Sequence, residues 1–113
     1  MAVTRNLTID QGANYSATIT CTQQTDGAPL DLTLYTHRAM LRKSYNSDTG
    51  VSFVTSNTVA QAISGIFVIS LTNAQTANLD PRLRYVYDTE IIRANVVTRI
   101  CQGYITIKPE VTK

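Results

Sequence analysis

The sequence predicts an all-β fold, either an antiparallel sandwich or a small barrel, with about seven to eight short strands and one short helical turn. Threonine, isoleucine and valine supply 36 of the 113 residues, and Thr alone supplies 17. Such branched side chains are stiff in a helix and fit a pleated surface. Apolar and polar residues also alternate in short runs that turn residues separate, which is typical of sandwiches and barrels.

Strand-like alternation marks the N-terminal third of the chain. In the run 6–10, Leu7 and Ile9 occupy one face, while the run Tyr15–Cys21 places Tyr15, Ala17, Ile19 and Cys21 on its apolar face. The segment Thr25–Pro29 follows as a turn, because its Gly supplies positive φ and its Asp can bond to nearby backbone. Each of these strands has the pattern of a half-buried strand.

The middle third contains three or four further strand segments. Residues 35–43 alternate without showing which face is buried, and 44–50 is a polar loop before a strand at 51–54. The run 58–63 is a possible short strand. The run 66–71 is nearly all apolar, which predicts a strand that is covered on both faces or lies centrally.

One short helix and the two longest strands complete the chain. Asn73 can cap one or two helical turns over 74–79, which Pro81 closes by disfavouring helical geometry in the preceding residue. The strands 83–93 and 96–108 follow, joined as a hairpin by two residues, Ala94 and Asn95. On the last strand we expect Val97, Cys101, Gly103, Ile105 and Ile107 to share one face.

The composition bounds the domain organisation and the function. A chain of 113 residues forms one core, so we expect a single domain over 1–113 with short flexible arms, 1–5 and 108–113. The net charge of +2 makes nucleic acid an unexpected partner, and the longest apolar run, 66–69, cannot span a membrane. No secretory signal is visible, although a mature secreted chain would look the same.

The sequence shows no catalytic, cofactor or metal site, and we expect a protein that is not an enzyme. The single histidine, His37, has no recognisable nucleophile partner, so a structural role is favoured. Asp88 and Glu90 share a strand face, but Arg84 lies on the same face, which favours a solvated surface of mixed charge over a pair of catalytic carboxyls. No dense calcium-binding loop and no zinc motif is present.

Cys21 and Cys101 are expected to be buried free thiols. They lie 80 positions apart without a CxxC motif, and both have the parity of core residues on their strands. A bridge between the second and the last strand is geometrically conceivable in a sandwich, but nothing in the sequence indicates an oxidising compartment.

Two further groups of residues are candidates for structure or binding. Arg38, Arg42, Lys43 and Tyr45 form the densest basic and aromatic patch. It could track a single-stranded nucleic acid, but an ordinary basic strand end or a protein interface is the favoured interpretation of so few cations. Tyr85 and Tyr87 lie where immunoglobulin-like sandwiches keep a corner tyrosine, whose hydroxyl ties an incoming loop to the strand.

Several segments along the whole chain resemble small virion structural proteins of tailed phages, especially contractile-tailed cyanobacterial phages. The layout is also similar to the immunoglobulin-like N-terminal domain of phage baseplate upper proteins. The segments are 6–12, 26–27, 30–32, 39–44, 66–71, 72–79, 85–88 with Ile91, Gly103 and 109–112. The sequence departs from the family before the tyrosine strand, where family members usually have Gly and this chain has 80–84 without one.

The resemblance implies an immunoglobulin-like sandwich and a non-enzymatic part of a virion, assembled in the host cytoplasm, in the tail or baseplate. Its expected partners are other virion proteins and further copies of itself in a symmetric homo-oligomer. A neck or capsid decoration protein is the alternative position. A carbohydrate-binding or receptor-binding sandwich module is the alternative from another class of protein.

Overall fold

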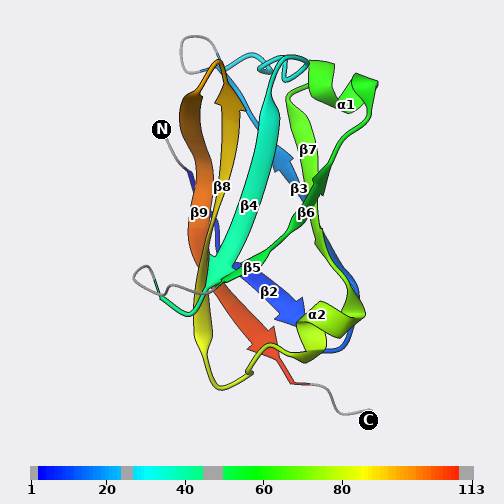
Figure 1. Ribbon diagram of the computed structural model, residues 1–113, viewed down its shortest axis with the longest axis vertical. Helices are drawn as coiled ribbons and strands as arrows, with labels where there is room; N and C mark the ends of the chain where they lie inside the picture. The colour runs from blue at the N-terminus through cyan, green and yellow to red at the C-terminus, as the bar shows by residue number, and fades with distance from the viewer. Residues whose placement is uncertain (1–2, 24–26, 45–49, 110–113) are drawn as a thin grey trace.

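The computed structural model describes residues 3–23, 27–44 and 50–109, which form a two-layered β-sandwich (Figure 1). The all-β sandwich prediction is confirmed, with nine strands and two short helices in the described residues. In chain order the elements are β1 (Val3–Thr4), β2 (Leu7–Asp10), β3 (Tyr15–Thr20), β4 (Thr36–Arg42), β5 (Gly50–Ser52), β6 (Val54–Ser56), α1 (Val59–Ile63), β7 (Ile66–Leu71), α2 (Asn73–Ala77), β8 (Arg84–Arg93) and β9 (Val96–Lys108).

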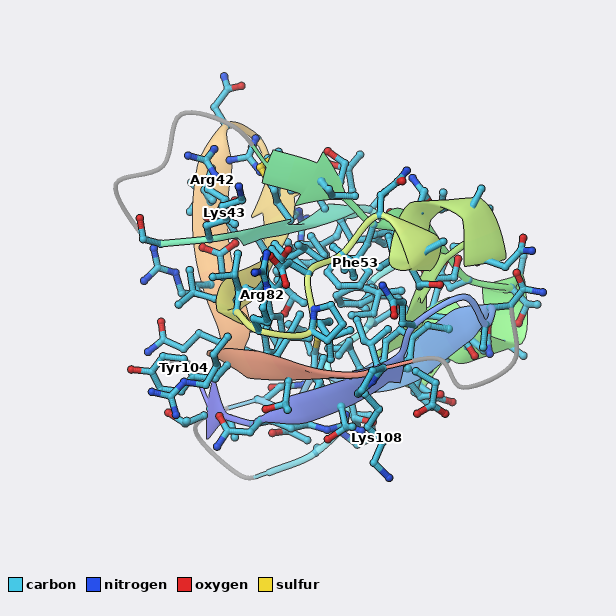
Figure 2. All side chains as sticks on the ribbon, turned by 90° about the horizontal axis from the view of Figure 1, so that it is seen from below. Arg42, Lys43, Phe53, Arg82, Tyr104 and Lys108 are labelled. Carbon is cyan, nitrogen blue, oxygen red and sulfur yellow. The ribbon has the colours of Figure 1, made fainter. Side chains whose placement is uncertain are left out.

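The two layers differ in size. The larger sheet has the order β1-β9-β8-β4-β5, with β2 also paired to β9, and the smaller sheet has the order β3-β7-β6. All pairs are antiparallel except those of β1 and β2, which run parallel to β9. The chain changes sheets at Phe53, whose N–H bonds to the Ala39 carbonyl at 2.9 Å between β5 and β6. Figure 2 shows Phe53 inside the molecule and Tyr104 on its outside.

The core lies between the inward faces of the two sheets. Alternation in β2 and β3 is as predicted, with Leu7, Ile9, Ala17 and Ile19 buried and the intervening residues exposed. In β4 the structure identifies the buried face, which carries Ala39 and Leu41. The strand β7 lies centrally in its sheet but is covered on one face only, because Phe67, Ile69 and Leu71 are buried and their neighbours are half-buried.

The β8–β9 hairpin is as predicted, but its register is interrupted. Ala94 and Asn95 both have positive φ (50° and 66°). A two-residue turn in this backbone conformation has a twist that matches the twist of the flanking strands. Thr89 lies opposite Cys101 and Glu90 opposite Arg99, so Ile100 is an extra residue, a β-bulge. In residues 96–99, which precede the bulge, the inward and outward positions are therefore exchanged. The prediction that Val97 shares the face of Cys101 is therefore wrong, and Val97 is 47% exposed.

The short strand predicted over 58–63 is wrong, and this segment forms α1. The Thr58 hydroxyl accepts a bond from the Gln61 N–H, and the Gln61 side chain accepts one from the Thr58 N–H. This reciprocal capping box satisfies two backbone donors that a helix start leaves unpaired. The same arrangement of Thr72 and Gln75 starts α2, so Thr72 is the cap in place of Asn73.

The prediction of a flexible N-terminal arm over 1–5 is wrong for residues 3–5, which bond to the larger sheet. Val3 and Thr4 pair with β9, and the Arg5 N–H bonds to the Gln102 carbonyl at 2.8 Å. Gly103 makes this close approach possible, since a Cβ there would lie 2.4 Å from the Arg5 carbonyl oxygen. At the other end, β9 continues to Lys108. Residues 1–2 and 110–113 of the two arms, residues 25–26 of the predicted turn and residues 45–49 of the predicted loop lie outside the described residues.

Candidate functional site

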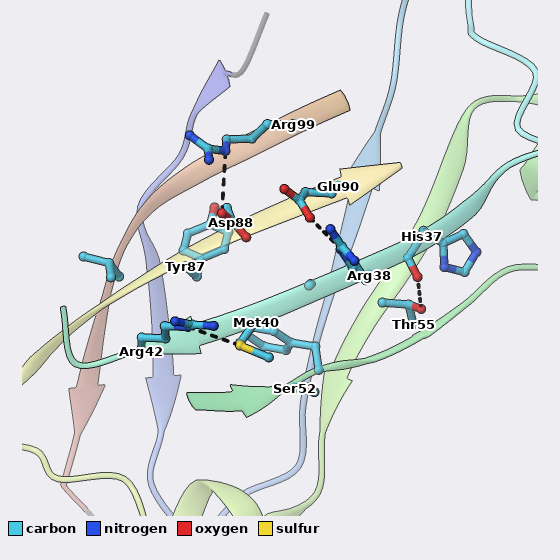
Figure 3. Close-up of a pocket in the computed structure, with 13 residues that line it drawn as sticks. His37, Arg38, Met40, Arg42, Ser52, Thr55, Tyr87, Asp88, Glu90 and Arg99 are labelled. Atoms are coloured by element: carbon cyan, nitrogen blue, oxygen red, sulfur yellow. Dashed lines mark hydrogen bonds and ion pairs between the residues drawn. The ribbon is translucent and has the colours of Figure 1, made fainter. Parts of the chain in front are cut away.

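The outer face of the larger sheet contains a groove of about 640 Å³, lined by β4, β8, β9 and the β5–β6 corner (Figure 3). Its charged lining residues come from three neighbouring strands: Arg38 and Arg42 from β4, Asp88 and Glu90 from β8, and Arg99 from β9. Alternation along each strand turns these side chains away from the core, because their neighbours Ala39, Leu41, Tyr87, Thr89 and Ile91 are buried.

Two ion pairs cross the floor of the groove. Arg38 Nε bonds to Glu90 Oε1 at 2.6 Å, and Arg99 Nε lies 3.5 Å from Asp88 Oδ2. The carboxylates are the more buried partners: the side chains of Glu90 and Asp88 are 17% and 35% exposed, against 62% and 51% for Arg38 and Arg99. The acids thus lie low in the groove, and the guanidinium groups lie nearer to its rim.

A third arginine is held in a similar way. Arg42 Nε lies 3.3 Å from the Met40 sulfur on the same face of β4 (Figure 3). Next to it in the sheet, Val86 is only 8% exposed although it faces outward, and it pairs with Arg42 on one side and Tyr104 on the other. The Arg84 guanidinium lies 4.3 Å from the centre of the Tyr104 ring. The outer face is therefore a layer of arginine side chains packed on other groups.

The groove raises the pKa of one of its own carboxyls. Burial raises the pKa of Asp88 above the ordinary value of 3.8, the neighbouring Glu90 carboxylate raises it further, and Arg99, Arg42 and Arg38 offset part of this effect. The folded state therefore holds the Asp88 proton more tightly than the unfolded chain. Ionised Asp88 costs stability above the folded pKa, and this cost disappears as the pH falls below the ordinary value.

We therefore expect Asp88→Asn to stabilise the protein at neutral pH, by less than about 1 kcal/mol because the group is partly solvated. Well below the ordinary value of 3.8 the carboxyl is protonated in both states, and the two proteins should be equally stable. Urea unfolding of both proteins at neutral and acidic pH measures this difference. A variant that is less stable than the parent at neutral pH would contradict it and would make the Arg99 pair the dominant interaction.

The structure divides the predicted basic and aromatic patch. Arg38 and Arg42 share the groove, but Lys43 lines a separate, smaller pocket with Leu79 and Tyr85. Tyr45 lies outside the described residues. Sequence reasoning correctly placed Asp88, Glu90 and Arg84 on one face.

Arg99 is the groove residue that sequence reasoning could not find. Unbroken alternation along 96–108 puts Arg99 on the same side as Cys101, inside the sandwich. The bulge at Ile100 turns Arg99 outward and sets it opposite Glu90, which lies two residues from Asp88 on the same face of β8. Isoleucine is no signal for a bulge, so the sequence contains no warning of this reversal.

The two tyrosines of β8 tie neighbouring backbone to the sheet. The Asp80 N–H donates to the Tyr85 hydroxyl at 2.9 Å, so Tyr85 holds the loop that precedes its own strand, the role expected of a corner tyrosine. Tyr87 donates to the Arg5 carbonyl and lies 3.2 Å from the Cys101 sulfur. Both side chains are buried, and burial together with the Cys101 contact raises the pKa of Tyr87.

Cys21, Cys101 and His37 are packed into the sandwich. Both cysteines are buried, no disulfide joins them, and burial with the nearby Cys101 raises the pKa of the Cys21 thiol to about 11. His37 stacks on Phe67 of the opposite sheet, with ring centres 4.9 Å apart. Within the described part of the chain its buried Nδ1 has no hydrogen-bond partner. The stacking contact gives His37 a place in the packing between the sheets.

A second surface, here called the apolar end, is the end of the sandwich that carries α1, the segment 29–35 and the β8–β9 turn (Figure 1). It carries Leu34, Val59, Ile63, Val96 and Val97, which are 70%, 77%, 56%, 64% and 47% exposed. Two contacts hold these segments at one end of the sandwich: the Leu32 N–H bonds to the Ala62 carbonyl, and the Arg93 guanidinium lies 5.7 Å from the Tyr35 ring. Exposed apolar side chains gathered in this way mark contact surfaces.

The fold and its surfaces define an all-β sandwich with an arginine-rimmed groove on one sheet and an apolar end. No protein-family model matches the chain, and no curated protein is significantly similar to it in sequence. In the described residues no helix has the length and apolar character needed to cross a membrane. No group of three metal-ligating side chains is gathered in that same part of the chain.

Proposed function

We propose that this protein is a non-enzymatic structural component of a phage particle, in its tail or baseplate, which acts by binding other virion proteins and copies of itself. The resemblance of its segments to small virion proteins supports the particle assignment. The low content of charged residues, 16%, supports a surface that neighbouring proteins cover. Hydroxyl-bearing side chains cost less to desolvate than charged ones.

The apolar end is the observation that carries the proposed binding role. Val59 and Ile63 lie four residues apart on α1 and therefore share one face of the helix, where both are more than half exposed. Burying two such side chains against a partner contributes about 1.5–3 kcal/mol each. A short helix that exposes its two largest apolar groups is better explained by a partner than by the stability of the isolated domain.

The outer face of the smaller sheet supports the same role. Ser16, Thr18 and Thr20 form an exposed row on β3 without a charged side chain among them. A neck or capsid decoration protein would use the same surfaces. A carbohydrate-binding module would instead need exposed aromatic platforms. Phe53, Phe67, Tyr85 and Tyr87 are all buried, and the Arg84 guanidinium lies over the ring of the exposed Tyr104.

Mass spectrometry of purified particles tests the assignment. We expect the chain to be present, with cross-links from α1 to another protein. Replacing Val59 and Ile63 together by serine should reduce incorporation at least about tenfold, because about 1.4 kcal/mol of lost contact energy changes an equilibrium by that factor. Ala60→Ser, at an exposed position of the same helix, is the matched control and should leave incorporation unchanged.

Absence of the chain from the particles would overturn the assignment. Cross-links confined to neck or capsid proteins would move it to another part of the virion, and specific binding on a glycan array by a protein absent from particles would favour the carbohydrate-binding alternative. Equal incorporation of the double variant and Ala60→Ser would show that the apolar end is not the contact surface.

A further inference from the structure

We infer that the edge of β3 that faces away from β7, here called the outer edge, binds an extended segment of a partner protein. The segment adds a strand to the smaller sheet and places an acidic side chain beside Arg5. The inference rests on the proposed function in one respect, that the occupant is a protein. Within the described part of the chain β3 pairs with β7 alone, so it is an edge strand.

The register of β3 shows which backbone groups face the outer edge. The N–H of Cys21, directly after β3, bonds to the carbonyl of Gly65, directly before β7, at 2.7 Å. Bonded and non-bonded residue pairs alternate along an antiparallel ladder. The odd-numbered residues of β3 therefore bond to β7, and the even-numbered residues direct N–H and C=O groups to the outer edge. These outward residues are Ser16, Thr18 and Thr20, and all three are exposed.

Among the described residues, Arg5 alone bonds to these outward backbone groups. Its Nη1 donates to the Thr18 carbonyl at 2.9 Å, which agrees with the outward direction of that carbonyl. A carbonyl oxygen has two lone pairs, so Thr18 can also accept a bond from an added strand. The three outward N–H groups and the other two carbonyls bond to no described residue. The outer edge thus offers an almost complete ladder of donors and acceptors.

β3 is also the longest edge strand in the described sheets. It has six residues, whereas β1, β2, β5 and β6 have two, four, three and three. Natural edge strands prevent unwanted pairing with a charged side chain, a proline or a bulge. β3 contains no charged residue and no proline, and its register with β7 is unbroken. Strand addition by an extended segment uses an edge of this kind.

The side chains around the outer edge define the chemistry of the segment. Its outward side chains would lie beside Ser16, Thr18 and Thr20, where hydroxyl-bearing and branched partners pair favourably. Its inward side chains would face the larger sheet, from which the exposed Arg5 extends to β3. No described carboxylate forms an ion pair with Arg5. An acidic side chain in the segment therefore gains a charge-assisted hydrogen bond.

The same arginine disfavours a second copy of the chain as the occupant. In an antiparallel pair of two β3 strands centred on Thr18, both Arg5 side chains would lie at the two-fold axis, because each bonds to its own Thr18 carbonyl. Like charges so placed repel each other. A segment with a carboxylate opposite Arg5 has the complementary charge, so a different protein fits the outer edge better.

Fluorescence anisotropy with a labelled peptide, Thr-Val-Thr-Glu-Thr-Val-Thr, tests the inference on the purified full chain. In extended form this peptide presents threonine on one face and its glutamate between two valines on the other. We expect saturable binding, and at least about tenfold weaker binding by Thr18→Pro, because proline removes the central outward N–H without removing a bond to β7. Thr18→Val retains this N–H and is the matched control, which should bind like the parent.

A charge reversal in the peptide tests the role of Arg5. Lysine in place of the glutamate should weaken binding to the parent about tenfold, because the charge-assisted bond is replaced by repulsion. In Arg5→Gln the two peptides should bind about equally. Arg82→Gln is the matched control and should retain the full difference, because Arg82 bonds to Asp80 and to no residue of β3.

Amide hydrogen exchange locates the site without any substitution. In the unbound chain the amides of Ser16, Thr18 and Thr20 should exchange rapidly, whereas those of Ala17 and Ile19, which bond to β7, should be protected. The glutamate peptide should slow exchange at the three outward amides at least about tenfold and leave the other two unchanged. Binding through side chains alone would not produce this alternating pattern.

Any of five results would overturn the inference: no saturable binding, unchanged exchange at the outward amides, equal binding by Thr18→Pro and Thr18→Val, equal binding of the two peptides by the parent, or a dimer in sedimentation velocity that Thr18→Pro abolishes. The last result would assign the outer edge to a second copy. Thermal unfolding verifies that each variant is folded, and exchange in the parent decides the question if Thr18→Pro is not.

These failures are distinct from failure of the proposed function. A chain that is found in particles but does not bind the glutamate peptide contradicts the inference about the outer edge alone. A chain that binds the peptide with the expected exchange pattern but is absent from particles contradicts the virion assignment alone.

Discussion

Replacing Phe67 by alanine is expected to destabilise the protein by about 4 kcal/mol, a large part of the 5–15 kcal/mol that holds a domain of this size together. Phe67 is completely buried, lies on the central strand of the smaller sheet and stacks on His37 of the larger one. Its removal leaves a cavity between the sheets and takes away the ring on which His37 packs. The free energy of unfolding from urea denaturation measures the loss.

Val68→Ala is the matched control for this prediction. Val68 is the next residue of β7, and its side chain is half-buried on the outer face of the same sheet. We expect it to cost less than about 1 kcal/mol, the range of strand preferences at such positions. Equal losses for the two variants would mean that Phe67 does not organise the contact between the sheets.

Gly103→Ala is expected to detach the N-terminal strand from β9. A Cβ at position 103 would lie 2.4 Å from the Arg5 carbonyl oxygen and 2.9 Å from its carbon, contacts that side chains do not tolerate. Since these are backbone atoms, relief requires the segment at Arg5 to move. That movement would break the Arg5 N–H bond to Gln102 and the Tyr87 hydroxyl bond to the Arg5 carbonyl. We expect a loss of about 3 kcal/mol.

Hydrogen exchange distinguishes this local effect from general unfolding. The amides of Val3, Thr4 and Arg5 should lose protection in Gly103→Ala, while those of β4 and β7 retain it. Thr106→Ala, at an exposed position three residues along β9, is the control and should leave the N-terminal protection unchanged. Unchanged protection at Arg5 in the glycine variant would refute the prediction.

The strands were predictable because alternation is a local property. Leu7 with Ile9 and Ala17 with Ile19 face the core as their spacing predicts, and the hairpin turn forms at Ala94 and Asn95. The segment 58–63 was misassigned because branched residues favoured a strand there. Its Thr-x-x-Gln capping box was a readable helix signal, and the same signal recurs at 72–75.

The candidate groove was only half predictable. Arg38, Asp88 and Glu90 lie on outward faces that alternation identifies, but no local pattern sets one strand beside another. Lys43 follows Arg42 in sequence but does not line the groove, whereas Arg99 is distant in sequence and lies against Asp88. Proximity across a sheet depends on strand order and register, which nonlocal packing decides.

Composition and period-two alternation were enough to establish a strand-rich chain with little charge, because both act within each segment. The parallel N-terminal strands, the bulge at Ile100 and the groove depend instead on contacts between segments that are distant in the sequence. A bulge reverses every side chain on one side of it, and the packing of both sheets selects the register at which the most apolar surface is buried. Arg99 owes its place in the groove to that selection.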